Sequence, residues 1–73
     1  MKTSDKQKIK RKIAVKLYQV RNELDIKQTY LQQEGIISQS HLSKIENGDM
    51  NISAVMLYAL ARRYSKDISF FFE

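Results

Sequence analysis

The chain has 73 residues, of which 42% are apolar and 29% charged, a balance typical of one small soluble globular domain. Its formal net charge of +5 favours nucleic acid or an anionic membrane surface as partner, unless the charge serves solubility alone. The absence of cysteine excludes disulfides and thiolate metal sites, and no apolar run is long enough for a membrane span or a secretory signal.

The first predicted element is a helix that ends near Asp25. Ser4 and Gln7 have the spacing of a capping box at its start. Residues 1–24 hold eight basic residues against two acidic ones, whereas the other 49 residues hold five basic and six acidic ones. The positive field therefore lies on residues 1–24, which begin with a basic N-terminal segment (residues 1–8). Apolar residues recur at helical spacing on the opposite side, namely Ile9, Ile13, Leu17, Val20 and Leu24.

The second predicted helix covers residues 27–34, with Tyr30 and Leu31 expected to face inward and Gly35 to end it. A third helix is expected to start after Ser38, a good N-cap, and to run to about residue 47. Leu42 and Ile45 are its expected buried anchors. Gly48 is expected to stop the helix in a left-handed conformation.

Ser53 is expected to cap a fourth helix that continues through Tyr64, and Asp67 is expected to cap a final turn with the sequence ISFFF. The absence of proline and the presence of only two glycines favour helices throughout. The sequence therefore predicts an all-α fold, a compact five-helix bundle that forms a single domain over residues 1–73. The residues expected to face inward near the C-terminus are Leu57, Leu60, Ala61, Tyr64, Ile68 and Phe71.

The short connection between the second and third helices contains a glycine, which is typical of a helix-turn-helix over about residues 28–47. In that unit the second helix lies in the major groove of DNA with its first residues against base edges. The polar side of SQSHLSKIENG suits this position. Gln39 can pair bidentately with adenine, Ser40 can donate to or accept from several bases, and Lys44 can reach guanine or a phosphate.

From about residue 17 to residue 72 the sequence resembles the helix-turn-helix domain of the Cro/cI-like (XRE) family of bacterial and phage transcriptional regulators. The likeness rests on a spaced pattern: Arg21 four residues before a turn, Gln28 at the start of the second helix, then ISQS, LSKIENG, LARRY and DISFFF. The resemblance implies a lambda-repressor-like DNA-binding domain that works in the cytoplasm on double-stranded DNA.

The resemblance also implies a role for particular residues. Gln28 would bind a backbone phosphate and brace Gln39, which would read a base. Arg21 and Glu46 match a pair that forms a partly buried salt bridge between the first and third helices. From the sequence itself we expect the lone histidine, His41, to border the groove, where contact with a phosphate or a base stays open. The residues expected at the DNA are Gln28, Ser38, Gln39, Ser40, His41, Ser43, Lys44, Asn47 and Asn51, the two asparagines being loop positions that hold phosphates.

Three positions depart from the family pattern. Gln32 stands where a small residue is usual, Ile36 where glycine is usual, and Ile52 where a loop proline is usual. The GDMNIS loop and the short length resemble the controller proteins of restriction–modification systems. Peptide-responsive regulators of Gram-positive bacteria contain sequences similar to SHLSKIENG, so both subfamilies stay open.

The fourth and fifth helices carry more apolar residues than a small core needs, and an exposed apolar patch usually marks an interface. We expect a homodimer that places two recognition helices on a palindromic operator. Docking onto a further domain of a longer sensor-regulator is the alternative. The residues expected in the dimer interface are Val55, Met56, Tyr58, Ala59 and Phe70.

The sequence thus predicts a transcriptional regulator that acts by occupying an operator, with repression and activation both open. It contains no nucleophile–base pair, phosphate loop or cluster of metal ligands, so we expect no enzymatic activity, no cofactor and no metal. A protein-interaction module such as an antitoxin is the main competing hypothesis. A membrane-surface peptide ranks last, because the core accounts for the apolar stripe of the first helix.

Overall fold

A computed structural model describes residues 3–73 of the chain, with side chains from Asp5 onward. The side chain of Ser4, and with it the predicted capping box, lies outside the described part. Over this range the protein is all-helical and holds four α-helices and a terminal 3₁₀ helix. They are α1 (Thr3–Glu23), α2 (Gln28–Gln33), α3 (Gln39–Glu46), α4 (Ala54–Arg63) and η1 (Ile68–Phe72).

The predicted five-helix count is not matched exactly, because the fifth predicted helix is a 3₁₀ helix that follows four α-helices. As predicted, Asp67 caps it: the Asp67 carboxylate accepts a hydrogen bond of 2.9 Å from the Ser69 N–H, which lowers the pKa of Asp67. The Phe70 N–H then donates to the Asp67 carbonyl at 3.0 Å, three residues back. This three-residue spacing is the 3₁₀ pattern, which proteins use in short pieces such as this five-residue segment.

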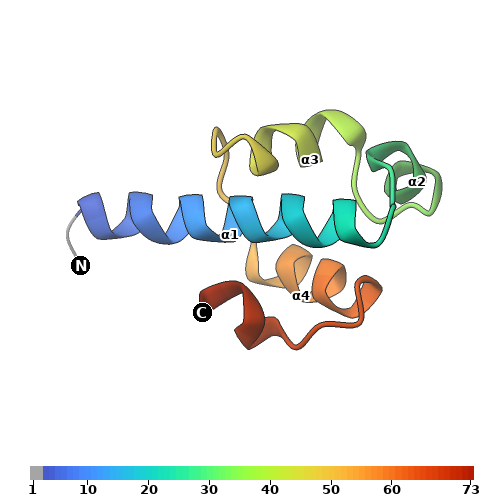
Figure 1. The fold of residues 1–73 in the computed structure, drawn as a ribbon. Helices are drawn as coiled ribbons and strands as arrows, with labels where there is room; N and C mark the ends of the chain where they lie inside the picture. Colours follow the sequence, from blue (N-terminus) through green and yellow to red (C-terminus); the bar gives the residue numbers. More distant parts are fainter. Residues whose placement is uncertain (1–2) are drawn as a thin grey trace.

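The helices pack around α1, which lies at the centre of the molecule (Figure 1). α2 and α3 lie on one side of it, and α4 and η1 lie on the other. α3 and η1 both contact α1 directly. The N-terminal half of α1 projects past the other elements, which gives the molecule an elongated outline of 37 × 24 × 21 Å.

One apolar core joins all five elements. Leu17, Leu31, Leu42, Leu60 and Phe71 each expose none of their surface, so every element contributes one fully buried anchor. The predicted inward positions of the last two elements are buried, except that Ile68 is only partly so. No helix within residues 3–73 is both long and apolar enough to cross a membrane.

Three predicted core residues lie mostly at the surface. Tyr30 is 43% exposed, because successive helix positions point about 100° apart and Leu31 takes the inward direction. Ile9 and Leu24, at the two ends of the predicted stripe, are 39% and 46% exposed. Ile9 belongs to the projecting half of α1, where fewer elements cover the helix, and Leu24 follows its last turn.

All four α-helices end in the same way, with a residue of positive φ that turns the chain. At the end of α3 this residue is Gly48 (φ 79°): its N–H donates to the Ile45 carbonyl, and the next N–H donates to the Lys44 carbonyl at 2.9 Å. This pair of bonds is a Schellman motif, and it satisfies carbonyls that the helix leaves free. The three other helices repeat it at Asp25, Gly35 and Ser65.

Candidate nucleic-acid interface

The start of α3 is fixed by two side chains. Ser38 adopts the extended backbone of an N-cap, and its hydroxyl accepts from the His41 N–H at 3.3 Å. The carbonyl oxygen of the Gln32 side chain accepts from the Gln39 N–H at 2.7 Å. Free N–H groups at a helix start need such partners. Gln32, noted from sequence only as a departure from the family, thus ties α2 to the first residue of α3.

The outward side of α3 is determined by its buried side. Leu42 and Ile45 are 0% and 2% exposed and hold the helix against the core. Residues 39, 40, 43, 44 and 47 follow one another at one-, three- and four-residue spacing, so they form one strip on the other side. The members that are fully at the surface are Gln39, Ser40, Lys44 and Asn47, while Ser43 and the neighbouring His41 are half-buried.

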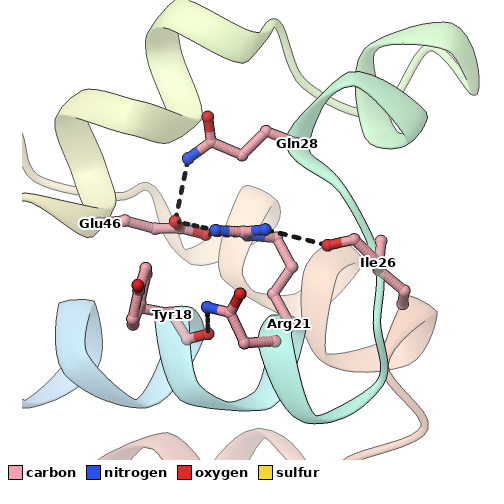
Figure 2. A network of polar contacts seen from close by, with 6 residues as sticks. Tyr18, Arg21, Ile26, Gln28 and Glu46 are labelled. Atoms are coloured by element: carbon pink, nitrogen blue, oxygen red, sulfur yellow. Dashed lines mark hydrogen bonds and ion pairs between the residues drawn. The ribbon is translucent and has the colours of Figure 1, made fainter.

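Behind this strip, Arg21 and Glu46 form a two-pronged ion pair between α1 and the end of α3 (Figure 2). The guanidinium donates from Nε to Glu46 Oε2 at 2.8 Å and from Nη2 to Glu46 Oε1 at 2.9 Å. Its Nη1 donates to the Ile26 carbonyl at 2.9 Å, in the loop before α2. The Arg21 and Glu46 side chains are 10% and 3% exposed, so this pair is largely removed from water.

The hydrogen bonds from Arg21 to Glu46 raise the pKa of Arg21, and burial opposes them. The guanidinium therefore remains charged and cancels the carboxylate at the end of α3. This cancellation matters for the outward strip, because an unpaired carboxylate there would repel a polyanion. The same contacts also link α1, the loop before α2, and α3, so they set how the two helices of the helix-turn-helix are oriented.

Gln28 joins this network at the start of α2. Its Nε2 donates to Glu46 Oε1 at 3.0 Å, as Figure 2 shows, so its amide nitrogen binds Glu46 and not Gln39. Gln28 and Gln39 nevertheless line one surface depression, together with Lys27 and Thr29. Sequence reasoning missed these last two residues. Their only sequence signal is their position on either side of Gln28 at the start of a helix.

The loop after α3 borders a second, polar depression. Asn47, Gly48 and Asp49 line it from the loop, and Gln7, Lys10 and Arg11 line it from α1. Asn51 is also exposed and lies along the neighbouring groove between the loop and α1. The polar residues expected at DNA therefore lie along α3, at its N-cap, in the loop after it or at the start of α2. Residues 3–73 bring together no group of three or more metal-binding side chains.

Comparison with known proteins agrees with this geometry. A family model described as helix-turn-helix matches residues 17–71, well over half of the chain, and this span contains α2, α3 and the Arg21–Glu46 pair. No curated protein and no solved structure gave a significant match. The chain belongs to the Cro/cI-like (XRE) family of DNA-binding helix-turn-helix proteins.

Proposed function

We propose that this protein is a transcriptional regulator that binds double-stranded DNA in a sequence-specific manner, as a homodimer on a palindromic operator. The observation that carries the proposal is the surface of α3. Buried Leu42 and Ile45 fix the helix, and the side left to solvent presents short uncharged donors and acceptors with one cation, Lys44. Such side chains suit close approach to base edges in a major groove.

Base reading and backbone binding are divided between different residues in this proposal. Gln39 stands at the first position of α3, where its amide can pair with adenine N6 and N7. Ser40, Ser43 and Lys44 follow along the groove. Asn47 and Asn51 hold phosphates on one side of α3, and Gln28 with Lys27 holds them on the other. Phosphate contacts of this kind fix the register of the helix without reading sequence.

The homodimer is supported by apolar surface on α4. Val55 is 82% exposed and Tyr58 is 52% exposed, while Met56, Ala59 and Phe70 are partly covered. A twofold contact through this surface would place two α3 helices about 34 Å apart, one turn of DNA. If the chain were instead a protein-interaction module such as an antitoxin, the same surface would hold its partner protein.

Selection from a random duplex library tests the proposal. We expect enrichment of a palindromic site, and we expect Gln39→Ala to weaken binding to that site by about 1–3 kcal/mol while relaxing the preference at one base pair. Circular dichroism should stay unchanged, because Gln39 contributes to the fold through its backbone N–H.

Gln19→Ala is the matched control, since Gln19 is an exposed glutamine of α1 away from α3. It should leave binding to the selected duplex unchanged. Equal losses in the two variants would contradict the assignment of α3 as the recognition helix. A library that shows no enrichment would favour the protein-interaction module.

A further inference from the structure

Residues 3–16 of α1 precede the part of the chain that matches the helix-turn-helix family. At about 1.5 Å per residue this segment is about 20 Å long, and its first turns are the part of α1 that projects past the other elements in Figure 1. From Asp5 to Lys16 it carries six cations and one carboxylate. The six cations are Lys6, Lys8, Lys10, Arg11, Lys12 and Lys16, and none of them forms an ion pair with a described carboxylate.

These cations are divided between different sides of the helix. Lys10 and Arg11 line the polar depression beside Asn47 and Gly48, at the end of α3. Lys8 and Lys12 point elsewhere and line hollows beside Phe72 and the C-terminal residue Glu73. Arg11 also borders the hollow beside Glu73, so it lies between the two sides. The chain therefore offers two pairs of basic residues with equal charge, of which only Lys10 and Arg11 line the polar depression at the end of α3.

Lys10 lines a depression with each of the two loop asparagines. It shares the polar depression with Asn47, and it shares the neighbouring groove with Asn51 and with Lys6. If the two asparagines hold phosphates, as the proposed function states, the same DNA strand passes next to Lys6, Lys10 and Arg11. A DNA strand that passes the loop after α3 is then within reach of these long basic side chains.

The local charge favours that contact. Two carboxylates line the polar depression, those of Glu46 and Asp49. Glu46 is already paired with Arg21, which leaves Asp49 against Lys6, Lys10 and Arg11. The balance along this side of α1 is therefore positive, which attracts a phosphate backbone.

We propose that the projecting half of α1 is a second DNA-contacting element, in which Lys6, Lys10 and Arg11 bind the phosphates adjacent to those held by Asn47 and Asn51. This inference rests on the proposed function and adds a part of the chain that lies outside the family domain. The contacts go to the backbone only, so they raise affinity for any duplex and do not change which sequence is preferred.

The test compares two double variants with equal loss of charge, K10Q/R11Q and K8Q/K12Q, on the selected duplex and on an unrelated duplex of the same length. The dependence of log K on log salt measures the number of phosphates neutralised. For K10Q/R11Q we expect the slope to fall by about 0.9 for each charge removed per bound protomer, on both duplexes. For K8Q/K12Q the slope should stay close to that of the wild type.

The outcomes separate this inference from the proposed function. If wild type prefers the selected duplex and Gln39→Ala removes that preference, the function stands whatever the α1 variants do. An equal drop in slope for both double variants would show a diffuse positive field and would overturn the inference, as would no drop in either. Capture of wild type by phosphatidylserine vesicles, with unchanged DNA slopes in both variants, would assign the segment to a membrane surface and overturn it too.

Discussion

At the scale of single residues, Arg21 joins three parts of the domain: α1, the loop before α2, and α3. All three nitrogens of its guanidinium donate hydrogen bonds, two to Glu46 and one to the Ile26 carbonyl. The ion pair was expected from the family resemblance. The bond to Ile26 was not, because any residue has a backbone carbonyl and the sequence carries no sign of which one a guanidinium will reach.

Arg21→Ala should destabilise the fold by about 3–5 kcal/mol, because it leaves the Glu46 carboxylate buried without its counter-charge. The Ile26 carbonyl would also lose its partner. Urea denaturation followed by circular dichroism measures the change. The double variant Arg21→Met/Glu46→Leu should recover most of the loss, since it removes both charges together.

The ion pair between Arg63 and Glu34 is the matched control. It has the same chemistry, with Arg63 Nε 2.6 Å from Glu34 Oε1, but both side chains are over one third exposed. Water screens such a pair, so Arg63→Ala should leave the denaturation midpoint nearly unchanged. If Arg21→Ala proved as mild as Arg63→Ala, burial would not be what makes the first pair important.

At the scale of elements, the sequence predicted helix starts better than it predicted side-chain direction. Ser38 and Ser53 cap α3 and α4 through side-chain bonds to the His41 and Met56 N–H groups, as expected, because a cap depends on local chemistry alone. The predicted inward direction of Tyr30 was wrong, because the side of α2 that faces the core depends on how α3 packs against α2. The hydrogen bond from the Gln39 N–H to the Gln32 side chain depends on the angle between α2 and α3, so it could not be predicted from the sequence either.

The four Schellman endings give a prediction at this scale. Asp25 and Ser65 adopt φ values of 56° and 57°, which L-residues with a side chain adopt at a cost of roughly 1 kcal/mol and glycine adopts freely. Ser65→Gly should therefore stabilise the domain by about 0.5–1 kcal/mol and raise its melting temperature by about 2–8 °C. Thermal unfolding followed by circular dichroism measures this gain.

Gly48→Ala is the reverse experiment. A methyl group at Gly48 would meet no atom within 4 Å, so its effect comes from the backbone conformation alone (φ 79°). It should lower stability by roughly 1–2 kcal/mol. A loss in Ser65→Gly would show that the serine side chain contributes more than its conformation costs.

At the scale of the whole molecule, the uneven charge along the chain was clear from the sequence, but its consequence was not. The basic residues of the N-terminal segment belong to one long helix, and only the fold shows that Lys10 and Arg11 lie beside the loop that follows α3. These segments are more than thirty residues apart in the chain. Helical spacing groups residues on a face but does not say which other element that face meets.

A substitution at Val55 tests the proposed homodimer at the scale of the whole molecule. Val55 is 82% exposed in the single chain, so it adds little to the core, and it lies in the first turn of α4, where a carboxylate suits the helix dipole. Val55→Glu should therefore keep the fold and its melting temperature. In a homodimer through α4, however, the twofold axis would bring the two new carboxylates close to each other in an apolar contact, which is costly.

Sedimentation should show a wild-type dimer and a Val55→Glu monomer at the same micromolar concentration. The monomer should lose affinity for the full palindrome and keep a weak interaction with a half-site, because its α3 surface is intact. Ser69→Glu, an exposed position of η1, controls for added charge and should stay dimeric. A wild type that sediments as a monomer with and without the selected duplex would rule out the homodimer, and a dimeric Val55→Glu would move the contact away from the start of α4.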